Sequence, residues 1–328
     1  MLFPVNGSPV RTPWACGAGS HVGRRAVTGT ILAAAALLYV GGTSAASASG
    51  TRTVVINAVG AENEYANVLS QIGGEHVKVS SILNNPNTDP HTFEASTSVA
   101  EEVSHAELIV QNGVGYDGFM NDIESASPNP KRKVIVVQHV LGLPDDTPNP
   151  HLWYDPKTMP AVAAVMAEDL SELDSNARAY FQARLLSFDS SLKPWFTAIA
   201  AFKAKYAGTA VATTEPVADY LLTAMGMRNL TPFVFQADIM NGVDPAPEDI
   251  TLENRFLTKH QVRVFCYNQQ VVDSLTTSIR ETAQAAGVPV VGVYETMPTP
   301  GYDYQTWMLA EVAAIQAAVA HRTSTEHL

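Results

Sequence analysis

Seven short runs rich in β-branched residues recur along the chain, and helix-favouring stretches separate them. The runs are TVVINAV, VKVSSIL, ELIVQN and KVIVVQ in the first half, and TAVATT, VRVFCY and VPVVGVY in the second. Strands that alternate with helices form parallel sheets, because each helix carries the chain back to the starting edge of the sheet. The pattern predicts an α/β fold of two lobes, each with a mainly parallel sheet flanked by helices.

A long helix-favouring segment, residues 176–206, separates the two sets of strands. Apolar residues keep a three-to-four spacing along it, at Leu185, Phe188, Leu192, Trp195, Phe196 and Ile199. A continuous helix of this length would be about 46 Å long, which exceeds an ordinary crossover. Pro194 predicts a kink or a division into two helices. We expect an N-terminal lobe over residues 49–174, a connecting helix over 175–206 and a C-terminal lobe over 207–328.

The first 48 residues have the pattern of a secretory signal peptide. Arg24 and Arg25 precede the apolar run AVTGTILAAAALLYV, and the small residues Ala46 and Ala48 follow it. The run has about 15 residues, fewer than the roughly 20 that cross a bilayer, so cleavage near Ala48 is favoured over a retained anchor. We therefore expect an exported protein, periplasmic or located at the cell surface or outside the cell.

Charge and cysteine content exclude several classes of function. The chain has 20 Lys and Arg against 32 Asp and Glu, and no basic cluster lies beyond the N-terminal segment, so a nucleic-acid partner is not expected. Cys16 lies in the signal segment, which leaves Cys266 as the one cysteine of the processed chain. This excludes an intramolecular disulfide and a cysteine metal site. Cys266 lies in the apolar run VRVFCYN and is predicted to be a small buried side chain.

One glycine motif has the glycine spacing of a dinucleotide-binding pattern but lacks another residue that the pattern requires. NGVGYDG places Gly113, Gly115 and Gly118 at the spacing G-x-G-x-x-G after the run ELIVQ. The dinucleotide fingerprint also requires an acidic residue at the end of the next strand, and here that strand ends in Gln138 and His139. We interpret the motif as a plain turn from strand to helix.

Four side chains of the kinds that bind metal ions occupy loops at strand ends or just before helices. They are His91 in TDPHTFEAS, His151 in PNPHLWYDP, Glu215 in ATTEPVADYLL and Glu295 in VVGVYETMPTPG. Ligands of open α/β sheets bind beyond the carboxyl ends of the strands, so these loops are able to converge. Ligand imidazoles usually donate their second N–H to an oxygen, and we considered Asp89, Asp155 and Asn241 for that role.

These motifs, in this order and at these separations, resemble the metal-binding substrate-binding proteins of zinc and manganese ABC transporters, in which one rigid helix joins two lobes. The resemblance covers roughly residues 52–320 and includes YETMP followed by YDYQTWMLAEVAAI. It implies one metal ligand from each of four loops, that is His91, His151, Glu215 and Glu295. It also implies a monomer that is not an enzyme, carries Zn²⁺ or Mn²⁺ as its transported ligand and delivers it to an ABC transporter permease in the cytoplasmic membrane.

Three features of this sequence depart from that family. Residues 115–150 contain a single histidine, His139, where zinc-binding members carry a histidine-rich loop. The fourth ligand is commonly aspartate, so Asp303 is an alternative to Glu295. Cys16 precedes the apolar run, so the lipid-modified cysteine of many members has no counterpart. Two carboxylates favour the harder ion Mn²⁺, whereas the intrinsic order of affinity favours Zn²⁺, and both ions stay open.

Two other functions use some of the same residues. A secreted zinc metallohydrolase would hold the ion with His91 and His151 and use Glu215 or Glu295 as general base, and it would keep one coordination position open. The sequence contains no H-E-x-x-H motif, which is a signature of such enzymes. An adhesin or a binder of organic metal chelates would instead predict an aromatic, apolar cleft.

Overall fold

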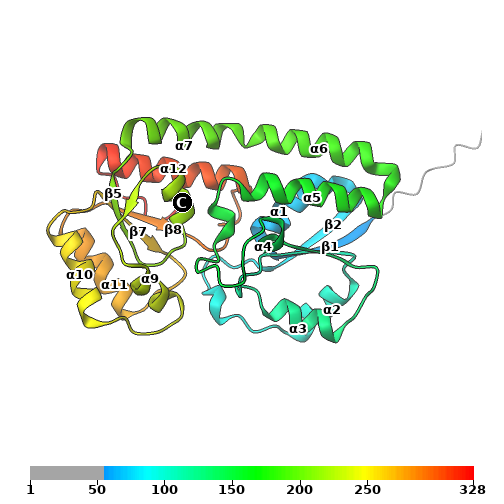
Figure 1. Cartoon of the computed structure of the whole chain (residues 1–328), viewed down its shortest axis with the longest axis horizontal. Helices are drawn as coiled ribbons and strands as arrows, with labels where there is room; N and C mark the ends of the chain where they lie inside the picture. The colour runs from blue at the N-terminus through cyan, green and yellow to red at the C-terminus, as the bar shows by residue number, and fades with distance from the viewer. Residues whose placement is uncertain (1–54) are drawn as a thin grey trace, which may run out of the picture. The chain divides into compact units, whose positions relative to one another are not determined.

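Two parallel four-stranded sheets organise the chain (Figure 1). The structure is a computed structural model that describes residues 55–328, so the predicted signal peptide, residues 1–48, lies outside the described residues. The first sheet has the strand order β2-β1-β3-β4, and the second has the order β6-β5-β7-β8. The strands are β1 (Ile56–Glu62), β2 (Val77–Leu83), β3 (Leu108–Gln111), β4 (Lys133–Val136), β5 (Ala210–Thr213), β6 (Arg228–Asn229), β7 (Val264–Asn268) and β8 (Val290–Val293). The predicted fold class is confirmed.

Helices cover both faces of each sheet. In the first lobe α1 and α5 pack on one face, and α2 and α3 cover the other. In the second lobe α12 packs on one face, and α9, α10 and α11 cover the other. The helices are α1 (Asn63–Gly73), α2 (Thr97–His105), α3 (Phe119–Ala126), α4 (Val137–Val140), α5 (Thr158–Leu173), α8 (Asp219–Ala224), α9 (Phe233–Met240), α10 (Pro247–Thr258), α11 (Ser274–Ala285) and α12 (Tyr304–His321).

Strands β3, β5, β7 and β8 are largely apolar because both of their faces are buried. In β7, Val264 and Cys266 point into the core that α12 shares, whereas Phe265 and Tyr267 point into the core beneath α9–α11. This alternation follows from the two-residue period of a strand. Cys266 is a buried free thiol, as its apolar run predicted.

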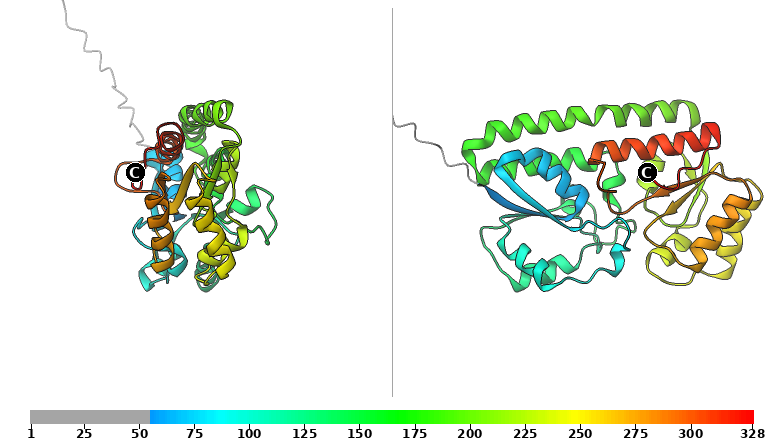
Figure 2. Two further views of the ribbon diagram at one scale, coloured as in Figure 1. Left: turned by 90° about the vertical axis from the view of Figure 1, so that its left-hand side faces the viewer. Right: turned by 180° about the vertical axis from the view of Figure 1, so that it is seen from behind.

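Two consecutive helices, α6 (Arg178–Ser191) and α7 (Lys193–Tyr206), run along both lobes (Figures 1 and 2). Leu192 separates them and keeps helical dihedral angles, with φ −78° and ψ −15°. Pro194 lies in the first turn of α7, where its missing N–H costs no hydrogen bond. The expected three-to-four stripe is buried at Phe188, Leu192, Trp195 and Ile199. In both figures α7 lies beside α12, which holds the second lobe against the connector.

Hydrogen bonds join the loops of the two lobes where the sheets end. The side chain of Asn63 and the backbone of Met297 exchange two bonds of 2.9 Å. Tyr154 Oη donates to the carbonyl oxygen of Tyr294 at 2.8 Å. Gln270 Nε2 donates to the carbonyl oxygen of Thr88 at 2.8 Å. Because the large core that contains Trp153, Trp195 and Trp307 also crosses between the lobes, their loops hold fixed positions relative to one another.

Within residues 55–328, no helix combines the length and the apolar character needed to cross a membrane.

Candidate metal centre

The four predicted ligand side chains all lie beyond the carboxyl ends of strands. His91 follows β2, and Asp89 holds its short turn by accepting the His91 N–H at 2.8 Å. His151 follows α4, and Glu215 and Glu295 come directly after β5 and β8. The parallel topology therefore carries loops from both sheets to one place, as the rule for open α/β sheets predicts.

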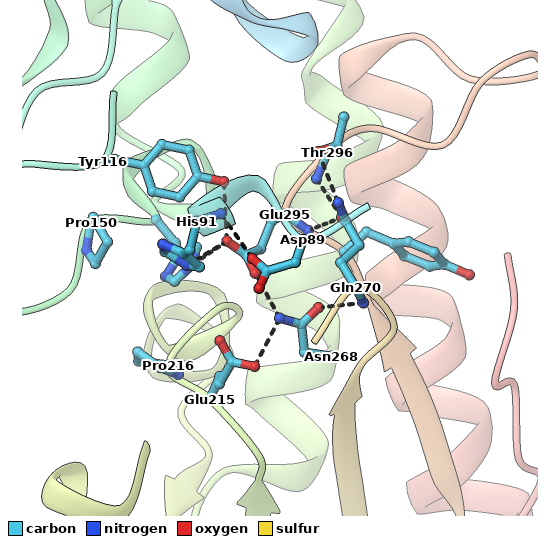
Figure 3. A network of polar contacts seen from close by, with 12 residues as sticks. Asp89, His91, Tyr116, Pro150, Glu215, Pro216, Asn268, Gln270, Glu295 and Thr296 are labelled. Atoms are coloured by element: carbon cyan, nitrogen blue, oxygen red, sulfur yellow. Dashed lines mark hydrogen bonds and ion pairs between the residues drawn. The ribbon is translucent and has the colours of Figure 1, made fainter. Parts of the chain in front are cut away.

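Three of these four side chains meet at one point (Figure 3). His91 Nε2 lies 3.0 Å from Glu295 Oε2, and His151 Nε2 lies 3.2 Å from the same oxygen. One ligand atom of each residue lies within 4.8 Å of the other two. In the part of the chain that the structure describes, this is the only group of three or more His, Cys, Asp or Glu side chains with that spacing. Two imidazoles and a carboxylate form a donor set that suits a transition-metal dication.

Glu215 does not belong to this close group, but a single amide connects it to the group. Asn268 Nδ2 donates to Glu215 Oε1 at 3.0 Å and to Glu295 Oε1 at 2.7 Å. Glu215 Oε2 is buried and has no hydrogen-bond partner among the described residues. Figure 3 shows this oxygen turned away from Asn268. The alternative ligand Asp303 is the N-cap of α12, where it accepts the Thr306 N–H at 2.9 Å.

The orientation of His151 indicates that a cation fits between it and Glu295. Its Nδ1 lies 2.8 Å from Asn149 Oδ1, which can only accept because Asn149 Nδ2 donates to the carbonyl oxygen of Pro216. A neutral His151 ring therefore carries its proton on Nδ1 and points the Nε2 lone pair at the Glu295 carboxylate. Two acceptors 3.2 Å apart repel each other unless a proton or a cation lies between them. Burial also lowers the pKa of His151, which favours the neutral ring that metal binding needs.

The negative charge of the site is concentrated on Glu295. Burial by itself raises the pKa of Glu295, but a proton between Glu295 Oε2 and His151 Nε2, together with the hydrogen bond and the charge of His91, outweighs burial and holds the pKa well below its ordinary value. For His91, burial lowers the pKa, but the hydrogen bond and the charge of Glu295 raise it above its ordinary value. Tyr116 Oη donates to Glu295 Oε2 at 3.0 Å. Glu295 is thus an ionised carboxylate at the centre of the group.

The surroundings of two further buried acids near Glu295 favour their protonated forms. Burial and the charge of Glu295 raise the pKa of Glu215 well above its ordinary value. Burial also raises the pKa of Glu64, and neither of its carboxyl oxygens has a partner among residues 55–328. A dication close to these acids favours their ionised forms, because opposite charge lowers a carboxyl pKa. Binding of a dication therefore increases the negative charge of the site.

Four important side chains were not predicted from the sequence. Asn149 holds His151, in the role for which Asp89, Asp155 and Asn241 were considered, and that assignment was wrong for His151. Asp155 instead accepts the Lys157 N–H, and Asn241 donates within α9. The other three unpredicted side chains are Tyr116, Asn268 and Gln270.

Partial signals existed for two of them. Asn149 lies two residues before His151, which is the ordinary spacing of a side chain that caps a turn. Tyr116 lies in the turn formed by the glycine motif NGVGYDG, where Gly113 and Gly115 have φ values of 80° and 77°. Nothing in the sequence connected that turn with Glu295.

The centre opens toward a cavity between the lobes. The cavity has a volume of about 490 Å³ and is lined by residues that include Asp89, His91, Asn241, Gln270 and Asp273. The side chain of His91 is 23% exposed, whereas those of His151 and Glu295 are fully buried. An ion that enters through this cavity therefore meets His91 first.

Comparisons with known proteins identify the family of the chain. A family model described as zinc-uptake complex component A, periplasmic, matches residues 59–318, which is well over half of the chain. The chain is 26% identical over 164 residues to the manganese-binding lipoprotein MntA of Bacillus subtilis, and the match spans 48% of this chain and 53% of that relative.

Solved structures share the fold. A crystal structure of ZnuA superposes with a TM-score of 0.67 at 20% identity, covering 81% of this chain and all of that one. The periplasmic zinc-binding protein TroA of Treponema pallidum superposes with a TM-score of 0.68 at 18% identity, covering 82% of this chain and 99% of that one.

Proposed function

Because the chain belongs to the family described as zinc-uptake complex component A, periplasmic, we propose that it is an extracytoplasmic substrate-binding protein for Zn²⁺ or Mn²⁺. It captures the ion between its two lobes and delivers it to the permease of an ABC transporter. The observation that carries the proposal is the meeting of His91 Nε2, His151 Nε2 and Glu295 Oε2 within 4.8 Å of one another at the boundary of the lobes.

Glu215 is the fourth ligand in this proposal. Its free oxygen, Oε2, is buried, and a buried carboxylate oxygen without a donor is costly unless a cation takes that role. Its neighbour Pro216 accepts a hydrogen bond from Asn149, the residue that orients His151. In this proposal the Glu215 side chain turns Oε2 toward the ion while Asn268 keeps its hydrogen bond to Oε1.

Delivery without chemical turnover is favoured over hydrolysis. The matching family is one of uptake-complex components, so it does not support the alternative of a secreted metallohydrolase. Four protein ligands close the coordination sphere of a zinc ion, whereas a hydrolytic site keeps one position for water.

We also propose that residues 1–48 are a signal peptide, that the lobes span residues 49–174 and 207–328, and that residues 175–206 connect them. The exported chain acts as a monomer, and its partner is a permease in the cytoplasmic membrane. The intact mass and the N-terminal sequence of the exported protein test the cleavage site, and a start other than residue 49 would contradict it.

Metal content of ligand variants tests the proposed function. The purified chain, equilibrated with Zn²⁺ or Mn²⁺ and desalted, is expected to hold about one ion, and His91→Ala and Glu295→Gln are expected to hold less than about a tenth of that. Inductively coupled plasma mass spectrometry measures the content. His105→Ala is the matched control, because His105 is an exposed histidine of the same lobe outside the group. Undiminished metal in both ligand variants would refute this ligand set.

A further inference from the structure

Asn268 lies between the two carboxylates of the centre and is fully buried at the end of β7. Its orientation is determined by the backbone, because Asn268 Oδ1 accepts the Gln270 N–H at 3.0 Å. The amide nitrogen Nδ2 must therefore face Glu215 and Glu295, to which it donates at 3.0 and 2.7 Å. The Asn268 N–H donates to Thr214 Oγ1 at 3.0 Å, which holds the residue from its other side.

Each hydrogen bond is made to one oxygen of its acid, named Oε1 in both. The partial positive charge of the amide hydrogen disfavours a dication at that oxygen, so Oε2 is the oxygen of each acid that favours an ion. Glu295 Oε2 faces both imidazoles and also accepts from Tyr116 Oη, whose hydroxyl hydrogen is able to rotate, and Glu215 Oε2 is the buried oxygen without a partner among the described residues. The amide of Asn268 thus binds one oxygen of each acid and leaves the other oxygen to face the ion (Figure 3).

We propose that Asn268 is a specificity-determining residue, which limits Glu215 and Glu295 to one metal bond each and thereby favours a four-coordinate ion. Two imidazoles and two singly bound carboxylates make four ligands, which is the number that zinc prefers. Manganese prefers six ligands rich in oxygen, and two doubly bound carboxylates with two imidazoles would provide six. The amide therefore shifts the site toward Zn²⁺, although the count of two carboxylates alone favours the harder ion.

This inference rests on the proposed function, because it assigns the ion preference of the same centre. It predicts that removing the donor releases both Oε1 atoms for a second bond to the ion. Asn268→Leu removes the whole amide at similar volume. Asn268→Asp keeps the oxygen that accepts the Gln270 N–H and replaces the donor by a second, charged oxygen. Both variants are expected to move the preference toward Mn²⁺.

Competition titrations with Zn²⁺ and Mn²⁺ test the inference. The ratio of the Mn²⁺ to the Zn²⁺ dissociation constant is expected to fall about 10- to 100-fold in both Asn268 variants, the range typical of changes next to metal ligands. Gln269→Leu is the matched control, since Gln269 is the adjacent amide and donates to the carbonyl oxygen of Glu326 instead. Its ratio is expected to equal that of the wild type.

X-ray absorption spectroscopy of the wild-type zinc complex gives an independent test that does not depend on any variant. Four nitrogen or oxygen neighbours are expected. Five or more neighbours, or an unchanged ratio in folded Asn268→Asp, would overturn the inference. Failure of the proposed function has a different signature, because the wild-type chain would then bind neither ion.

Discussion

Buried carboxyl groups in this protein differ in charge according to the donors around them. Glu295 lies within reach of Tyr116 and two imidazoles at one oxygen and of Asn268 at the other, and it is ionised. Glu253 is equally buried in α10 but accepts a single hydrogen bond, from Thr231 Oγ1 at 3.0 Å, and its Oε1 has no partner among the described residues. Burial raises the pKa of Glu253 to about 8. A buried carboxyl group is therefore ionised where several hydrogen-bond donors surround it and protonated where few do.

The raised pKa of Glu253 predicts a pH dependence of stability. Between its ordinary value of 4.5 and about 8, the folded chain keeps a proton that the unfolded chain has lost, so the free energy of unfolding falls as the pH rises through this window. Glu253→Gln is expected to remove this contribution, which is at most about 1.4 kcal/mol per pH unit. Urea unfolding at several pH values measures the slope.

The control for that experiment is Glu248→Gln, because Glu248 is exposed in the first turn of the same helix. Its slope is expected to match that of the wild type. A Glu253→Gln variant with the wild-type slope would show that Glu253 is ionised in the folded chain.

At the scale of elements, the last residues of the chain protect the edge strand that carries a metal ligand. β8 lies at the edge of the second sheet, and Glu295 follows it by two residues. Thr325 pairs with Val291 in a parallel bridge, the Gly292 N–H donates to the Thr325 carbonyl oxygen, and the Thr325 N–H donates to that of Val290, both at 2.9 Å. Covering an edge in this way satisfies backbone groups that would otherwise be open to other chains.

Deletion of residues 324–328 is expected to expose this edge. The Gly292 N–H would lose its acceptor, so its hydrogen exchange should become faster by at least about tenfold, while amides of the central strand β5 keep their rates. Hydrogen exchange followed by NMR or mass spectrometry measures the difference. Equal exchange at Gly292 in the full and shortened chains would contradict the assigned role of the tail.

At the scale of the whole described chain, contacts within the protein join the two lobes. The paired bonds between Asn63 and Met297, the bond from Tyr304 Oη to the Trp153 carbonyl oxygen at 2.6 Å, and the shared core all cross between them. The connector α6–α7 adds a rigid link along both lobes. An ion bound between the lobes therefore adds to contacts that the protein itself makes.

Removal of the ion is accordingly expected to lower the melting temperature without unfolding the chain. An ion present at a thousand times its dissociation constant adds about 4 kcal/mol to the free energy of unfolding. Differential scanning calorimetry with Zn²⁺ and with a chelator measures the shift. His91→Ala is the control and should melt at one temperature in both solutions. If zinc raises the melting temperature of that variant as much as that of the wild type, it binds elsewhere.

Local patterns in the sequence were sufficient for seven of the eight strands and for the kinds of ligand, whereas the two-residue strand β6 was not predicted. The apolar runs predicted the strands, because a strand buried on both faces is apolar throughout, and the spacing from Leu185 to Ile199 predicted the connecting helices. The sequence predicted His91, His151 and Glu295 as candidate metal ligands, because they are residues of metal-binding types in loops at strand ends. The predicted domain boundaries remain predictions.

Only the tertiary structure decided which side chains touch. Tyr116 and Asn268 contact Glu295 from segments that are far apart in the chain, and no local sequence pattern indicates which side chain a polar residue contacts. The structure also separated Glu215 from the close group and placed one amide between the two acids. The sequence determines the position of each ionisable group along the chain. Whether the group is charged depends on its burial and on neighbouring groups, and these are set only by folding.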